Sequence, residues 1–104
     1  MEMEFKLGAV IAERILTAIN ADGSESEVSV RLGTPGRIPD SRGVYAPYQI
    51  EYCGKTRTWY AAGMDGFQAL QLAIKMIAVE LDSLRRVYGV ELALHGDADT
   101  GLSF

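Results

Sequence analysis

Residues 65–88 constrain the fold more than any other part of this 104-residue chain. Apolar side chains recur there at alternating spacings of three and four residues, which is the pattern of an amphipathic helix. Asp65 is a good N-cap with Gln68 three positions later, and Gly89 is suited to end the helix. We therefore predict one helix over residues 65–88, about 36 Å long at 1.5 Å per residue.

The chain before this helix reads as strands joined by turns. Apolar and polar residues alternate in it, and turn-forming sequences at residues 20–24 and at Gly54-Lys55 join the alternating segments in pairs. The first segment also carries isoleucines four residues apart, as a helix would, but the turn and the clear strand after it favour a strand. The predicted strands span residues 10–20, 26–33, 47–53 and 56–62.

This order of elements predicts one α+β domain over residues 1–104. Its architecture is a four-stranded antiparallel meander sheet with one long C-terminal helix packed on one face. Residues 33–47 hold all three prolines and three glycines, so they form a long loop. We expect residues 34–46 to be the most mobile internal segment, cleaved first by proteases near Arg37 or Arg42.

Charge and cysteine content exclude several classes of protein. The net charge is −4 and the pI about 4.9, so we expect no nucleic-acid binding. The one cysteine, Cys53, cannot form an internal disulfide. The N-terminus lacks the pattern of a signal peptide, and no apolar run is long enough to span a bilayer. We therefore expect a cytoplasmic protein without membrane contact.

Three short motifs resemble known sites but lack the neighbouring residues that those sites require. Gly54-Lys55-Thr56 resembles the end of a phosphate loop, yet position 49 is glutamine and a strand follows, so a hairpin turn is favoured. Asp99-Thr100-Gly101 matches the tripeptide of aspartic proteases, but only three residues follow it. His95, Asp97 and Asp99 alternate near a turn without the further ligands that calcium or zinc requires.

Covalent catalysis is not indicated either. Any serine or cysteine nucleophile would depend on His95, which is the only histidine, and Cys53 is expected to be a packed strand residue. We predict no catalytic residue, no metal ligand and no cofactor. Glu51 and Arg57 are expected to face each other across a hairpin as a surface pair.

The helix carries two apolar rows. The row expected to face the sheet contains Phe67, Leu70, Ile74, Ile77, Leu81, Leu84 and Tyr88. A second row, expected on the opposite side, contains Ala69, Leu72, Met76 and Val79. A helix on a sheet needs only one apolar row, so the second must be covered, either by the chain's own C-terminal tail or N-terminal segment, or by another subunit. In the tail, Leu102 and Phe104 are expected to dock on the body of the domain.

Two functional hypotheses follow. The first is a non-catalytic protein-interaction or self-associating module, a homodimer or partner-binding protein, that uses the second row as its surface. The alternative is a small ligand-binding domain or enzyme with an aromatic-lined pocket. The aromatic residues available for such a pocket are Tyr45, Tyr48, Tyr52, Trp59 and Tyr60.

The helix start also resembles a known sequence pattern. Gly63-Met64-Asp65-Gly66-Phe67-Gln68-Ala69-Leu70 after a hairpin is similar to the Gly-x-Asp-x-x-Gln-Ala-Leu helix start in a family of small uncharacterised bacterial proteins. Pro47-Tyr48-Gln49-Ile50 resembles the family's third strand, and Asp99-Thr100-Gly101-Leu102 resembles its C-terminal end. His95 departs from the pattern near Leu94, where an aromatic residue is expected. The resemblance implies a β-meander followed by a helix, and it implies no activity.

Overall fold

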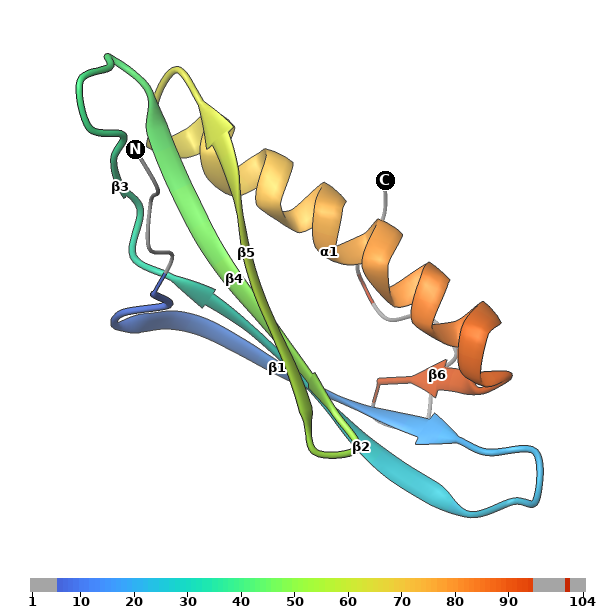
Figure 1. The fold of residues 1–104 in the computed structure, drawn as a ribbon. Helices are drawn as coiled ribbons and strands as arrows, with labels where there is room; N and C mark the ends of the chain where they lie inside the picture. The colour runs from blue at the N-terminus through green and yellow to red at the C-terminus, as the bar shows by residue number, and fades with distance from the viewer. Residues whose placement is uncertain (1–5, 95–100, 102–104) are drawn as a thin grey trace.

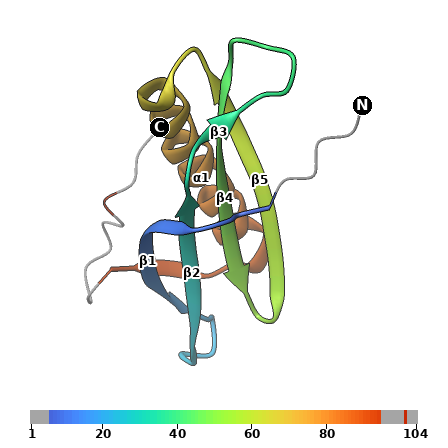
Figure 2. The same cartoon turned by 90° about the vertical axis from the view of Figure 1, so that its left-hand side faces the viewer.

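The computed structural model describes residues 6–94 and 101, which form an antiparallel sheet with one long helix on one face (Figure 1). Strands β1, β2, β4 and β5 are neighbours in that order, so the predicted meander is confirmed. Figure 2 views the molecule with the strands in front of the helix. The elements are β1 (Val10–Ile19), β2 (Glu25–Gly33), β3 (Gly36–Arg37), β4 (Val44–Tyr52), β5 (Lys55–Gly63), α1 (Gly66–Tyr88) and β6 (Glu91–Ala93).

The prediction of a four-stranded sheet was wrong, because the described part of the chain already forms a sheet of six strands. Strand β6 pairs with the end of β1, where Leu92 lies opposite Ala18. Strand β3 pairs with the start of β4, where Arg37 lies opposite Val44. Both extra strands have only two or three residues, too few for alternation to be recognised in the sequence.

About half of the expected loop at residues 33–47 is built into the sheet. Strand β4 begins at Val44, and the Ile38 N–H bonds to the Gly43 carbonyl across the turn (3.0 Å). Gly36 lets the chain pass close to Tyr45, since a Cβ at position 36 would lie 2.8 Å from the tyrosine ring. Gly36, which in the sequence was a sign of a loop, therefore allows two strands to approach each other closely.

The turn between β4 and β5 consists of Cys53 and Gly54. Their φ angles are 50° and 75°, and Tyr52 pairs with Lys55 on either side of them. Positive φ at both central residues is the type I′ geometry of tight hairpins. The predicted turn at Gly54-Lys55 was therefore displaced by one residue, and Cys53 is an exposed turn residue rather than a packed strand residue.

Helix α1 begins and ends as the sequence predicts. The Asp65 carboxylate accepts a hydrogen bond from the Gln68 N–H (2.8 Å), and the Gln68 side chain accepts one from the Met64 N–H (2.6 Å). These bonds satisfy donors that have no partner within the first helical turn. Gly89 ends the helix at a φ of 62°, and its N–H bonds to the Arg85 carbonyl.

The helix rests on the predicted sheet-facing row only in part, since Ile77 and Leu81 of that row are buried. Phe67 of that row is 82% exposed, and the central buried positions are Ala69, Ala73, Ile77 and Leu81. Ala69 and Ala73 belong to the same core cluster as Tyr48, which is large and fully buried. The apolar pattern predicted large helix side chains against the sheet. In the structure, close packing puts small helix residues over large strand residues.

Candidate interaction surface

The row predicted as an interaction surface lies on one flank of α1, not opposite its buried side. Ala69 is completely buried, so it leaves the candidate surface. Met76 is partly buried and packs against the core, while Leu72 and Val79 are 37% and 51% exposed. The members of the row therefore differ in exposure, and Leu72, Met76 and Val79 remain as its accessible part.

The register of β5 places a tryptophan beside this flank. Trp59 pairs with Tyr48 and Arg57 pairs with Ile50, and both β4 partners are buried in the core. Because residues opposite each other in a sheet project from the same face, Trp59 and Arg57 lie on the helix side. Trp59 is 42% exposed.

This register overturns the predicted pair of Glu51 and Arg57. Glu51 lies opposite Thr56, on the face away from the helix, whereas Arg57 forms an ion pair with Glu80 of α1. Residues 51 and 57 cannot share a face in this hairpin, because Ile50 lies opposite Arg57 and successive side chains on a strand alternate between the two faces.

A pocket of about 280 Å³ lies between the α1 flank and β5. Its walls are mainly apolar, with charged groups from Arg57, Lys75 and Glu80 at its borders. We call this pocket and the strand edge beside it the α1–β5 groove. The apolar and aromatic side chains that line it are Tyr48, Trp59, Leu72, Met76 and Val79.

A second pocket of about 500 Å³ continues the groove toward the end of the helix. Arg57 and Glu80 line both pockets, so their ion pair separates the two. In the second pocket Tyr52 and Tyr88 pack edge to face, with ring centroids 5.0 Å apart. The Lys55 ammonium lies 6.0 Å from the Tyr88 ring, at the outer limit of a cation–π contact.

Two buried polar atoms lie at the floor of the groove. Among the described residues, the Tyr48 hydroxyl and Glu80 Oε2 are buried side-chain atoms without a hydrogen-bond partner. Burial, and then the nearby Glu80 carboxylate, raise the pKa of the Tyr48 hydroxyl well above its usual range. The phenol is therefore neutral at physiological pH and can donate a hydrogen bond.

Strand β5 runs along the outer side of the groove. Tyr52 and Lys55 flank a two-residue turn and form a hydrogen-bonded pair. Hydrogen bonding alternates along an antiparallel pair, so Thr56, Thr58 and Tyr60 direct their N–H and C=O groups away from β4. Within residues 6–94 and at Gly101, no strand pairs with this side of β5.

The other flank of α1 faces β1. A pocket of about 210 Å³ lies there between Ile74 and Ile77 of the helix and residues of β1 and β2. Gly101 lies beside Arg14 of β1, where an added Cβ would be 2.6 Å from the guanidinium. Leu102 and Phe104, predicted to dock on the body, are outside the described residues. The described part of the closing segment thus lies on the β1 side, away from Leu72 and Val79.

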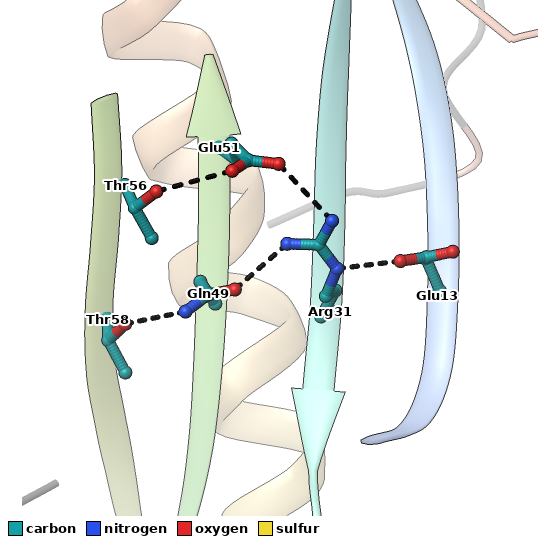
Figure 3. A network of polar contacts seen from close by, with 6 residues as sticks. All are labelled: Glu13, Arg31, Gln49, Glu51, Thr56 and Thr58. Atoms are coloured by element: carbon teal, nitrogen blue, oxygen red, sulfur yellow. Dashed lines mark hydrogen bonds and ion pairs between the residues drawn. The ribbon is translucent and has the colours of Figure 1, made fainter. Parts of the chain in front are cut away.

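The uncovered face of the sheet carries a polar network centred on Arg31 (Figure 3). Its guanidinium contacts Glu13 at 2.7 Å, Gln49 at 2.9 Å and Glu51 at 3.3 Å, and so joins β1, β2 and β4. These neighbouring acceptors raise the pKa of Arg31. Gln49 donates in turn to Thr58 of β5 (3.0 Å). All partners of Arg31 in this network are protein groups, so we interpret the network as a structural link between the strands.

The other residues considered from the sequence are not assembled into a site. Gly54-Lys55-Thr56 forms the end of a hairpin, as predicted. His95, Asp97 and Asp99 are outside the described residues, and no group of three or more potential metal ligands occurs among residues 6–94 and 101. Within the same residues, no helix is long and apolar enough to cross a membrane.

The five aromatic residues proposed to line one pocket are divided between the two faces of the sheet. Tyr48, Tyr52 and Trp59 lie on the helix side, and the strand alternation puts Tyr45 and Tyr60 on the other. Glu80 and Arg57 belong to the groove but were not singled out for it. The sequence pointed to Glu80 in part, because it is an acidic residue on the helix one position after Val79 of the apolar row.

Comparison with known proteins agrees with the resemblance noted in the sequence. The model of a protein family described as a domain of unknown function (DUF6968) matches residues 12–104. The chain belongs to this family. No match was found among curated proteins or among solved structures. Family membership therefore assigns no function, and the proposals below depend on the geometry of the groove.

Proposed function

We propose that this domain is a non-catalytic interaction module that self-associates through the α1–β5 groove. The observation that carries the proposal is the grouping of exposed Leu72, Val79 and Trp59 around one pocket between α1 and β5. Apolar side chains gathered on one surface mark an interaction site more often than scattered ones do. The single row on α1 is also self-complementary, as a two-fold contact between identical copies requires.

Light scattering of the purified protein tests this proposal. The wild-type protein is expected to have the mass of a dimer, and Met76→Lys is expected to be a folded monomer, because Ile77 and Leu81 still hold the helix on the sheet. Phe67→Lys is the matched control, since Phe67 is an exposed apolar residue elsewhere on the same helix. It should leave the dimer intact.

Two results would overturn self-association. A monomeric wild-type protein is one. The other is a Met76→Lys variant with a lower melting temperature and unchanged mass, which would show that the row is covered by the chain's own residues.

A second candidate function is the binding of a small, largely apolar ligand in the same groove. The buried Tyr48 hydroxyl and Glu80 carboxylate favour it, because a ligand with a hydroxyl or amine could bond to both of these neighbouring polar groups. The 280 Å³ pocket is close to the lower limit for ligand sites. Trp59 is the only tryptophan of the chain, so its fluorescence reports directly on binding. A compound library that leaves this emission unchanged would count against the candidate.

We also propose that the domain works in the cytoplasm. Its single cysteine is exposed at a hairpin tip, where an oxidising compartment would favour intermolecular disulfides. Fractionation of cells that produce the tagged chain tests the location, and recovery outside the cytoplasmic fraction would contradict it.

A further inference from the structure

We infer that the second pocket, between the β4–β5 hairpin and the last turns of α1, binds a small monocarboxylate with an apolar or aromatic body. The pocket adjoins the one proposed for self-association but has its own lining, and the inference does not depend on whether the chain forms a dimer. Its volume of about 500 Å³ is within the usual range of small-molecule sites, about 300–1,000 Å³.

The register of the hairpin builds one side of this pocket. Lys55 lies opposite Tyr52, and Arg57 lies opposite Ile50. Both β4 residues are buried in the core under the helix, and residues opposite each other in a sheet project from the same face. Lys55 and Arg57 therefore point to the helix side. Helix α1 supplies the other wall with Glu80, Ser83, Leu84, Val87 and Tyr88.

One end of the pocket is aromatic and incompletely buried. The Tyr52 ring, only 6% exposed, packs edge to face against Tyr88 with ring centroids 5.0 Å apart. This contact supports the Tyr88 ring but leaves it 48% exposed, and Val87 next to it is 73% exposed. The apolar body of a ligand would remove part of both side chains from water, which favours binding.

The charged groups of the pocket are unevenly distributed. Arg57 and Glu80 form an ion pair with each other at the border with the first pocket, so their charges compensate. Lys55 lines only the second pocket, and among the described residues its ammonium forms no ion pair. Its contact is the Tyr88 ring at 6.0 Å, the outer limit of a cation–π interaction. The pocket thus holds one uncompensated positive charge beside its aromatic end.

This single charge selects the class of ligand. A carboxylate gains an ion pair with the Lys55 ammonium, whereas an amine brings a like charge next to it. A phosphate monoester carries about two negative charges, which one cation does not balance. An uncharged apolar ligand leaves the ammonium without a new partner. A monocarboxylate with an apolar body therefore matches both the charge and the walls of the pocket.

An NMR titration of the wild-type protein tests the ligand class. Phenylbutyrate, phenylbutanol and phenylbutylamine share one apolar body and differ in charge. Phenylbutyrate is expected to shift the amide signals of Lys55, Ser83 and Val87 and to bind about tenfold more tightly than phenylbutanol, because it adds a charge-assisted contact. Phenylbutylamine should bind most weakly.

Two variants locate the contacts. Lys55→Met keeps an apolar stem and removes the charge, so the Kd of phenylbutyrate should rise about tenfold while that of phenylbutanol stays the same. Lys75→Met is the matched control, because Lys75 is an exposed lysine that lines only the first pocket, and it should leave both Kd values unchanged. Ser83→Trp places a large side chain from an exposed helix position into the pocket and should weaken both ligands. An unchanged melting temperature shows that each variant is folded.

Three results would overturn the inference. The first is the absence of shifts at Lys55, Ser83 and Val87 up to the solubility limit of phenylbutyrate. The second is phenylbutylamine binding as tightly as phenylbutyrate, which would assign recognition to Glu80. The third is a Lys55→Met variant with unchanged affinity for phenylbutyrate. The mass in light scattering tests self-association separately, so either proposal can fail without the other.

Discussion

The two edges of the sheet are finished in different ways. At one edge, β6 pairs with the last residues of β1 and buries Leu92 in the core. At the other edge, the outer side of β5 pairs with no strand among residues 6–94 and at Gly101, and Trp59 is half-exposed there. The first edge carries a strand of three residues over Thr17–Ile19 of β1, whereas nine residues of β5 form the second edge.

The two edges differ in how far their apolar side chains are removed from water by the chain itself. Leu92 stabilises the domain because it is removed from water by the chain itself. Trp59, Leu72 and Val79 contribute less to folding, since each keeps a large part of its surface in solvent. Side chains that a domain leaves exposed at a strand edge are available to a second molecule, and the following predictions test that distinction.

The largest expected effect compares the two edges directly. In the monomeric Met76→Lys background, Leu92→Ala should lower the free energy of unfolding by about 3 kcal/mol, because it leaves a cavity in the core. Trp59→Ala in the same background should cost about 1 kcal/mol or less. Urea denaturation measures both changes. Equal losses of unfolding free energy in the two variants would show that Trp59 contributes to the core as much as Leu92 does.

The next effect concerns the floor of the groove at alkaline pH. The pKa of Tyr48 is raised in the folded state, so its stability contribution is complete below about pH 10 and is lost as the pH rises above that value. Tyr48→Phe should remove this loss, which amounts to at most about 1.4 kcal/mol per pH unit. Denaturation curves at pH 9 to 11, taken about one unit apart, provide the comparison. Parallel curves for the two proteins would contradict it.

A smaller effect is expected at the turn before β5. Cys53 has a φ of 50°, a conformation that asparagine adopts more readily. Cys53→Asn should therefore raise the free energy of unfolding by about 1 kcal/mol. Cys53→Val is the control and should lower it, since a β-branched residue is strained there. Thermal melting distinguishes the two, and a stable valine variant would rule out the conformational explanation.

The smallest effect is expected away from both edges. Arg31→Met keeps the apolar stem but removes the contacts to Glu13, Gln49 and Glu51. Partly exposed ion pairs contribute little, so the free energy of unfolding should fall by about 0.5 kcal/mol. The mass in light scattering should not change. A shift to monomer would mean that the uncovered face of the sheet, and not the α1–β5 groove, holds the copies together.

Much of the fold could be predicted from the sequence. The limits of α1 followed from Asp65, Gln68 and Gly89, and the structure confirms each of their roles. The order of the four long strands followed from alternation and turn residues. These signals are local, because capping bonds and tight turns join residues only a few positions apart.

The candidate site could be predicted only in part. The exposed flank of α1 was anticipated through Leu72, Met76 and Val79, but Ala69 was placed on it wrongly. Trp59 was expected in an aromatic-lined pocket rather than beside the helix row, and the ion pair between Arg57 and Glu80 was not anticipated. Position 59 reaches the helix flank only because the turn at Cys53 and Gly54 sets the register of β5.

What the sequence determined by itself is which segments are strands, which is the helix and where that helix begins and ends. The tertiary structure decided which side of the helix is buried, which edge β6 closes and which side chains meet in the groove. Helix rotation and strand register depend on how side chains from distant segments fill the same space, such as Tyr48 beneath the small residues of α1. Such packing joins residues far apart in the chain, so no pattern within a single segment contains it.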